Sequence, residues 1–220
     1  MKKKISIIIT NYNRVAFIDR AIRSCLDQSL GSEFSVEIVV VDDCSTDNSL
    51  KLLDMFRDDI ILVQHKKNLG VAAASNSGLR AATGDFLMRL DADDFLNNYS
   101  VFILASILSE NNEYGFVYSD HFKVDERGFK KEKQRLNNLD VLYNHGAGVM
   151  YRNDVIEKIG FYDESLANCE DYDFLIRMTK NFNGFYVPLP LYRYSIHGNN
   201  LSLRDDREDY KNLVRSNHGI

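Results

Sequence analysis

The decisive stretch of this sequence is residues 85–94, which read Asp-Phe-Leu-Met-Arg-Leu-Asp-Ala-Asp-Asp. Residues 85–90 predict a buried strand, and this strand leads directly into Asp91, Asp93 and Asp94. Three carboxylates in four residues repel one another unless a cation or solvent separates them. Carboxylate oxygens suit Mg²⁺ or Mn²⁺, ions that also keep phosphate oxygens as ligands. The alternative is an acidic turn that caps the next helix, and the stretch taken alone favours neither interpretation.

On both sides of this stretch, apolar runs alternate with segments of helical periodicity. Residues 5–9 and 36–41 are short, rich in β-branched residues and almost continuously apolar, which is typical of strands buried on both faces. The alternation predicts an α/β fold with a mostly parallel central sheet flanked by helices. The predicted strands are 5–9, 36–41, 60–63, 85–90 and 115–118, and the predicted helices are 18–26, a segment after Thr46 that carries Phe56 inward, 70–82 and 99–108.

The second half of the chain follows a less regular pattern. Residues 123–133 are rich in charge and predict an exposed hairpin or loop. Residues 185–194 contain both prolines of the chain and predict a bent pair of strands. From residue 201 onward the chain is polar and predicts a loosely held helix. The remaining predicted elements are a strand at 146–151 and helices at 154–159 and 171–180.

Polar clusters follow three of the predicted strands. Parallel sheets bind ligands beyond the carboxyl ends of their strands, and residues 10–13, 42–43 and 91–94 all fall there. Tyr12 either contacts a base or ribose or forms a turn. Asp43 either binds a ligand or helps to cap the following helix.

Two further polar sites lie in the second half. Glu170 and Asp171 open a predicted helix, where acidic residues are favoured electrostatically without any other role. His197 lies in a loop, where it either ligates a metal or phosphate or is simply solvated. The chain has no GxGxxG, GxxxxGK[ST], HExxH or GxSxG motif, so a classical dinucleotide fold lacks support.

Length and charge narrow the class of protein. A chain of 220 residues predicts a single domain. Its net charge of −5 argues against binding nucleic acid by general electrostatics. The three cysteines form no CxxC pair, which favours a reducing compartment. No apolar run approaches the ~20 residues of a membrane span. We therefore expect a cytoplasmic protein, while peripheral membrane association and the oligomeric state stay open.

In combination these pieces are far more specific than each is alone. In order, spacing and placement on predicted strands, they resemble the family 2 inverting glycosyltransferases of the A-type fold (GT-A), a Rossmann-like nucleotide-sugar transferase fold. The resemblance runs from Lys4 to about Ser202. It is carried by residues 6–14, 37–47, 68–71, 76–78, 84–94, 160–164, 170–173 and 194–202.

The resemblance implies a role for each matching position at the donor site. One group would hold the nucleoside and ribose, with Asp43 as the partner of the base. A second group would bind a Mn²⁺ or Mg²⁺ ion that bridges the donor's diphosphate. The implied nucleoside-binding residues are Thr10, Tyr12, Asp43 and Asp91, and the implied metal ligands are Asp93, Asp94 and His197.

The resemblance also implies the reaction. Asp171 would be the general base that takes the proton of the acceptor hydroxyl, and Glu170 would help to bind the acceptor. The implied activity is metal-dependent, inverting transfer from a nucleotide-sugar donor, expected to be a UDP-sugar, to a glycan or lipid-linked acceptor. Surface polysaccharide or glycoconjugate synthesis is the expected setting. Residues 1–118 would form the nucleotide-sugar-binding half, 119–202 the acceptor and catalytic half, and 203–220 a C-terminal tail.

Three positions depart from the family pattern. Thr10 and Asn98 stand where the family often has proline, and Ser75 stands where it often has arginine, which leaves a basic contact to the donor in doubt. A sugar-phosphate nucleotidyltransferase is disfavoured because residues 10–14 contain no glycine. A non-catalytic nucleotide- or glycan-binding module of the same fold is disfavoured by the presence of Asp171.

Overall fold

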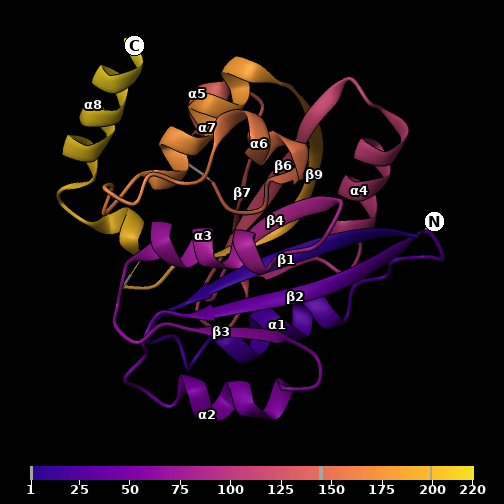
Figure 1. The fold of residues 1–220 in the computed structure, drawn as a ribbon, viewed down its shortest axis with the longest axis vertical. Coiled ribbons are helices and arrows are strands. Elements are labelled where there is room, and N and C mark those ends of the chain that lie inside the picture. Colours follow the sequence, from indigo (N-terminus) through magenta and orange to yellow (C-terminus); the bar gives the residue numbers. More distant parts are fainter. Residues whose placement is uncertain (1, 144–145, 199) are drawn as a thin grey trace.

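A curled sheet runs through the middle of the protein, and helices cover both of its faces (Figure 1). The computed structural model describes residues 2–143, 146–198 and 200–220. The sheet has the strand order β3-β2-β1-β4-β8-β6-β9-β5, with β7 paired to β6, and the predicted α/β class is confirmed. The strands are β1 Lys3–Asn11, β2 Phe34–Asp42, β3 Ile61–Gln64, β4 Phe86–Asp91, β5 Phe95–Leu96, β6 Tyr114–Val124, β7 Lys130–Gln134, β8 Met150–Arg152 and β9 Asn183–Ser195.

The four strands from β3 to β4 are parallel neighbours, as the sequence predicts. Their register pairs Asn11 with Asp42 and Thr10 with Asp91, so β1, β2 and β4 end at the same edge of the sheet. Successive residues of β1 enter different cores: Ile7 packs in one cluster and Ile8 in the other. Burial on both faces explains why these strands are apolar without alternation.

The helices divide between the two faces of the sheet. The core around α1, α2 and α4 covers one face, and the core around α3, α6 and α7 covers the other. Figure 1 shows α1 and α2 below the sheet and α3 above it. The predicted helices are confirmed, most of them with shifted ends, and one short helix, α5, was not predicted. The helices are α1 Ile18–Leu26, α2 Ser49–Leu53, α3 Val71–Ala81, α4 Ser100–Glu110, α5 Leu139–Leu142, α6 Asp154–Ile159, α7 Glu170–Asn181 and α8 Arg207–His218.

The sheet becomes mixed beyond β4. Strand β8 is antiparallel to both β4 and β6, whereas β9 is parallel to β6. The predicted strand pair at 185–194 is wrong, because one continuous strand, β9, covers it. Its register against β6 shifts beside Pro188 and Pro190, since proline has no N–H to donate. The predicted exposed hairpin at 123–133 is confirmed by the antiparallel pairing of β6 with β7.

The C-terminal segment is packed more firmly than the sequence predicts. Val214 of α8 is fully buried in a cluster that includes Ile176 of α7. At the end of α8, His218 Nε2 lies 2.8 Å from Asp173 Oδ1. Helix α8 therefore supports α7, the helix that begins with Glu170 and Asp171. Within the described residues, the structure contains no helix with the length and apolar character needed to span a membrane.

Candidate active site

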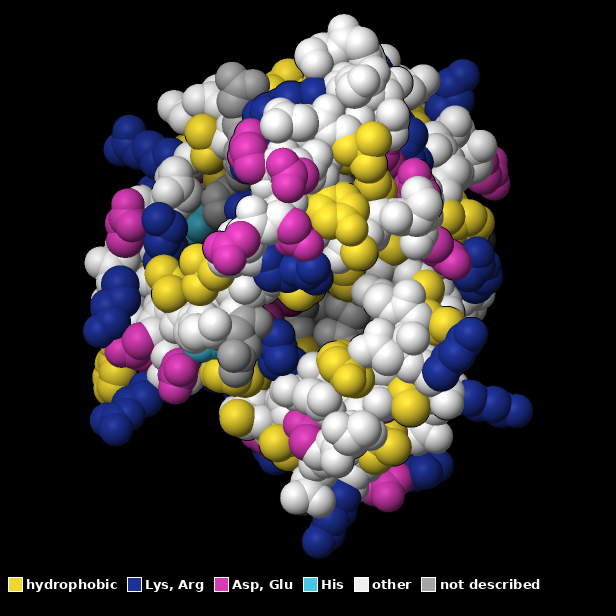
Figure 2. Space-filling view, turned by 90° about the vertical axis from the view of Figure 1, so that its left-hand side faces the viewer, with side chains coloured by type: hydrophobic (Ala, Val, Ile, Leu, Met, Phe, Trp, Pro, Cys, Tyr) yellow, Lys and Arg dark blue, Asp and Glu magenta, His cyan; other side chains and the backbone are white. Residues whose placement is uncertain are grey.

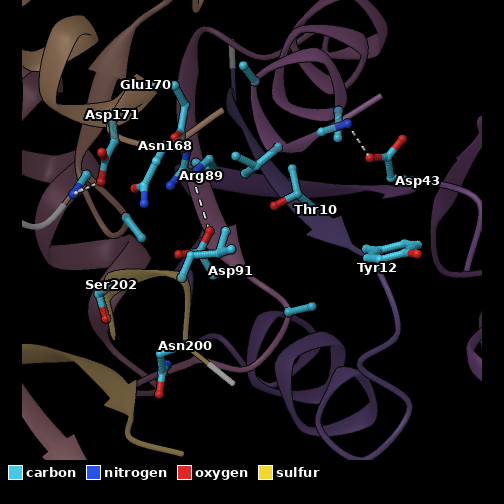
Figure 3. A pocket seen from close by; sticks show the side chains of 18 of the residues that line it. Thr10, Tyr12, Asp43, Arg89, Asp91, Asn168, Glu170, Asp171, Asn200 and Ser202 are labelled. Carbon is cyan, nitrogen blue, oxygen red and sulfur yellow. Dashed lines mark hydrogen bonds and ion pairs between the residues drawn. The ribbon is translucent and has the colours of Figure 1, made fainter. Parts of the chain in front are cut away.

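A cavity of about 540 Å³ lies beyond the carboxyl ends of β1, β2 and β4. Figure 2 looks onto this side of the molecule, whose surface is hollowed near its centre. In Figure 3, Thr10, Tyr12 and Asp43 lie at one side of the cavity, which we name the strand end. Asn168, Glu170 and Asp171 lie at the other side, which we name the helix end, and Asp91 lies between the two (Figure 3).

At the strand end, the Asp43 carboxylate is surrounded by hydrogen-bond donors. Its Oδ1 accepts the N–H of Leu69 at 2.8 Å and contacts Nδ1 of His65 at 2.7 Å. Its Oδ2 accepts the N–H of Gly70 at 2.7 Å, just before α3 begins. Because an ionised carboxylate can only accept, His65 Nδ1 is the donor. Asp43 is thus fixed by the loop that joins β3 to α3.

The neighbouring Asp42 makes structural hydrogen bonds within the protein. Its carboxylate accepts the side-chain N–H of Asn11 at 2.7 Å and the backbone N–H of Ser45 at 2.9 Å. Both bonds are internal, so Asp42 joins the ends of β1 and β2. Helix α2 begins only at Ser49, and therefore neither Asp42 nor Asp43 caps it. Tyr12 is 42% exposed at the mouth of the cavity.

The three acids at the end of β4 and just after it have different surroundings. Asp91 faces the cavity, and its Oδ1 lies 3.4 Å from Nε of Arg89. Asp93 contacts His197 Nε2 at 2.8 Å through its Oδ2. Asp94 is buried and accepts hydrogen bonds from the backbone N–H of Ser195 and from the Tyr192 hydroxyl. Burial, with the charges of Asp93 and Asp91, raises the pKa of Asp94 well above its usual range.

Asp93 Oδ2 lies 2.8 Å from His197 Nε2 and 3.2 Å from the guanidinium Nε of Arg14. An ion with bonds of about 2.0–2.1 Å places neighbouring ligand atoms about 3 Å apart. Asp93 and His197 match this spacing, although Arg14 contacts the same carboxylate oxygen. No group of three or more His, Cys, Asp or Glu residues in the described part of the chain could hold a metal. Phosphate oxygens and water would complete the shell of such an ion. Each oxygen of Asp94 accepts one hydrogen bond from the protein and the side chain does not line the cavity, so its share in metal binding stays a prediction.

His197 reaches Asp93 from a tightly built loop. Its ring stacks on Phe17 with a centroid distance of 4.8 Å. The Asn200 side chain accepts the N–H of His197 at 2.7 Å and donates to the Ser195 carbonyl at 2.9 Å. Phe17 therefore supports the imidazole ring, and Asn200 fixes the backbone that carries it. Asn199, which belongs to the predicted motif at 194–202, lies outside the described residues.

Between the two ends, a buried arginine joins the acids. Arg89 donates from Nη1 to Glu170 Oε1 at 2.8 Å, and the two side chains are 5% and 6% exposed. Burial and the charge of Asp171 raise the pKa of Glu170 to about 7, although Arg89 opposes the shift. Arg89 was not predicted as a site residue, although a charged residue in the middle of an apolar strand is a signal for one.

Asp171, the predicted general base, opens α7 and faces the cavity. Its Oδ2 accepts the N–H of Gly146 at 3.2 Å. A Cβ at position 146 would lie 2.2 Å from Cβ of Asp171, so a glycine is required for this close approach. Nothing in the sequence pattern pointed to Gly146. The loop before β8 thus fixes where the carboxylate of Asp171 lies.

Most predicted site residues therefore meet at one cavity, and their roles stay predictions. His197 reaches the cavity through Asp93, and Asp94 is turned into the protein. The predicted site residues that line the cavity directly are Thr10, Tyr12, Asp43, Asp91, Asp93, Glu170 and Asp171.

The sequence is similar to those of known glycosyltransferases. The sequence model described as "Glycosyl transferase family 2" matches residues 6–160. An uncharacterised glycosyltransferase of Bacillus subtilis, YwdF, is 28% identical over 99% of this chain and 85% of its own length.

Solved structures are similar as well. S. aureus TarS 1-349, in complex with UDP-GlcNAc, has a TM-score of 0.79 and 25% identity over 98% of this chain. The mannosyltransferase PcManGT of Pyrobaculum calidifontis, in complex with GDP-Man and Mn²⁺, has a TM-score of 0.70 and 16% identity over 91% of this chain. This chain spans 66% of the TarS chain and 59% of the PcManGT chain. The GT-A fold expected from the sequence is thereby confirmed.

Proposed function

The chain belongs to glycosyl transferase family 2, and on that premise we propose that it transfers a sugar from a UDP-sugar to an acceptor hydroxyl with inversion at the anomeric carbon. One observation carries the proposal. A single cavity has a fixed carboxylate, Asp43, at its strand end and a second carboxylate, Asp171, at its helix end. Such a cavity can bind a nucleotide-sugar at one end and remove a proton at the other.

The hydrogen bonds of Asp43 favour uracil as the base. A carboxylate offers about four acceptor positions, and three are filled by His65, Leu69 and Gly70. One position on Oδ2 remains. The uracil ring presents a single N–H, whereas guanine presents two neighbouring donors and would leave one unpaired, an unfavourable arrangement. The complex of TarS with UDP-GlcNAc supports the same choice.

The mechanism follows from the positions of the acids. Asp171 accepts the acceptor's hydroxyl proton as the acceptor oxygen bonds to the anomeric carbon. The bond from that carbon to the β-phosphate oxygen breaks at the same time, and the nucleoside diphosphate leaves from the opposite face. A divalent cation, Mn²⁺ or Mg²⁺, held by Asp93 and His197, would stabilise the negative charge on the leaving diphosphate. Glu170, anchored on Arg89, shapes the acceptor side of the cavity.

We propose a glycan or lipid-linked acceptor, in surface polysaccharide or glycoconjugate synthesis. The helix end is wide enough to be lined by several segments, among them the loop at 164–168 and the start of α8. A lipid-linked acceptor would bring the enzyme from the cytoplasm to the inner face of the cell membrane.

Calorimetry tests the donor and metal parts of the proposal. UDP should bind more tightly than GDP or CDP, and Mn²⁺ should strengthen binding. Asp93→Asn should remove most of the gain from Mn²⁺ while the melting temperature changes little. Equal UDP affinity in Mn²⁺ and in EDTA would contradict the metal role.

Turnover tests the reaction itself. The enzyme should release UDP from a UDP-sugar faster when a suitable acceptor is present. Donor binding with no release in any acceptor panel would favour the alternative, a non-catalytic binding module of the same fold.

A further inference from the structure

His65 links two segments behind the strand end of the cavity. It follows β3 directly, and its own N–H donates to the Asp42 carbonyl at 2.9 Å, which fixes its backbone beside β2. Its side chain is 9% exposed. The ring lies between Asp43, at the end of β2, and Ser77 in α3. His65 is not among the residues that line the cavity.

Both ring nitrogens have defined partners. Nδ1 is 2.7 Å from Asp43 Oδ1, and Nε2 is 2.9 Å from the Ser77 hydroxyl. Since the carboxylate accepts, Nδ1 carries the proton and donates to Asp43. The Ser77 hydroxyl, which can donate or accept, holds the Nε2 side of the ring.

We propose that His65 is a positioning residue for the nucleobase and acts through Asp43. Together with the N–H of Leu69 it fills Oδ1, while the N–H of Gly70 occupies part of Oδ2. The carboxylate is thus oriented so that its one remaining acceptor position is directed to the base. This inference rests on the proposed function, because it concerns how the nucleoside of the donor is bound.

Removal of His65 takes one hydrogen-bond donor from the Asp43 carboxylate. The carboxylate can then rotate more easily, because the last torsion of an aspartate side chain has only broad preferences. In His65→Ala, Asp43 keeps only its two backbone donors. A hydrogen bond to a charged group is among the stronger ones, so we expect UDP affinity to fall about tenfold. The donor KM should rise by a similar factor while kcat stays close to wild type, because His65 does not contact the reacting atoms.

Three further measurements distinguish a His65 that positions the Asp43 carboxylate from a His65 that only supports the loop. His65→Asn places an amide N–H near the position of Nδ1, so it should restore UDP affinity to within about threefold of wild type. Inorganic pyrophosphate with Mn²⁺ has no base, and its binding should be unchanged in His65→Ala. His218→Ala breaks a His–Asp contact of similar length, 2.8 Å, at α8, and should leave UDP affinity unchanged.

Calorimetry on wild type and these variants decides the matter. Wild-type UDP affinity in His65→Ala overturns the proposal, and so does an equal loss of UDP and pyrophosphate binding. If His65→Asn binds UDP as weakly as His65→Ala, the loss comes from a disturbed loop and not from the missing hydrogen bond to Asp43, and the proposal is wrong. Failure of the proposed function is a separate result. A wild type that prefers another nucleoside diphosphate rejects UDP, and the same variants are then compared on that nucleotide. A wild type that binds none overturns both.

Discussion

The strand end and the helix end of the cavity hold their carboxylates by different means. At the strand end, Asp43 is held by two backbone N–H groups and a histidine, all from one short loop region. At the helix end, Glu170 is held by a guanidinium 81 positions away in the sequence. Backbone donors fix a carboxylate without adding a charge to the interior. A buried arginine fixes one only as long as the whole charge network stays complete.

This difference matches the division of the proposed roles, with donor binding at the strand end and proton transfer at the helix end. At the strand end, the ring of Tyr12 is open to solvent while Asp43 is buried. At the helix end, Asp171 is partly buried, and burial and the charge of Asp171 raise the pKa of the buried Glu170 to about 7. Perturbed acids of this kind are often found where a proton is handled. We therefore expect substitutions at the helix end to affect rate and stability, and substitutions at the strand end to affect donor affinity.

The largest effect is expected from Asp171→Asn. The amide keeps the size of the side chain but cannot take the acceptor's proton, so the transfer rate should fall by about 10²–10⁴-fold. Donor affinity and melting temperature should change little. UDP release with acceptor measures the rate, and slow donor hydrolysis serves where the acceptor is not yet known.

If Asp171 has only a structural role, the opposite result is expected. It lies in the first turn of α7 and accepts the N–H groups of Tyr172 and Gly146, and Asn keeps a side-chain oxygen that can accept, so turnover would stay near normal. A fully active Asn variant would move the search for the base to Glu170 or Asp173.

Arg89→Met should affect stability more than any exposed ion pair. It leaves Glu170 and Asp91 without their guanidinium partner, and breaking a buried pair from one side typically lowers the free energy of unfolding by about 3–5 kcal/mol. Lys3→Met is the matched control. It breaks an exposed 3.1 Å pair with Asp85, for which about 0–1 kcal/mol is expected. Urea unfolding of both variants measures the difference, and equal losses would contradict the dependence of the helix end on its buried charge network.

The strand end could largely be predicted from the sequence. The apolar runs fix β1, β2 and β4 because each is buried on both faces, and parallel pairing then brings Thr10, Asp43 and Asp91 to one edge. Local patterns are sufficient here, since each polar residue lies at the end of its strand or directly after it.

The helix end could not be predicted in the same detail. Arg89 and Glu170 meet only because β8 lies beside β4 and α7 packs over that part of the sheet, which no local pattern records. Gly146 contributes by lacking a side chain where Asp171 approaches. The single strand β9 was missed for a related reason, because its path is set by pairing with β6 and β5 rather than by its two prolines.

Stability should also depend on pH through Glu170. Its pKa is raised to about 7 in the folded protein, whereas the unfolded chain ionises near its ordinary value of about 4.3. The folded state therefore binds the proton more tightly, and the resulting stability is complete below about pH 4 and is lost as the pH rises towards 7. One pKa unit corresponds to about 1.4 kcal/mol, so a loss of about 1–3 kcal/mol is expected.

Glu170→Gln isolates this effect, because glutamine cannot titrate. As the pH rises from about 4.5 to 7, the wild type should lose stability that the variant keeps. The unfolding free energy of the variant should therefore increase relative to that of the wild type. Denaturant unfolding at several pH values measures it. A difference that stays constant over this range would show that Glu170 is ionised throughout.

The smallest effect is expected at Tyr12, where the strand end is open. An aromatic ring that stacks on a base adds about 0.5–1.5 kcal/mol beyond its buried area, so Tyr12→Ala should weaken UDP binding by roughly three- to tenfold. Tyr12→Phe keeps the ring and should bind UDP like wild type. Because the ring is 42% exposed, neither variant should lower the melting temperature much. Loss of affinity in the Phe variant would instead assign the contact to the hydroxyl. A large loss of stability in the Ala variant would mean that the strand end, like the helix end, depends on its side chains to fold.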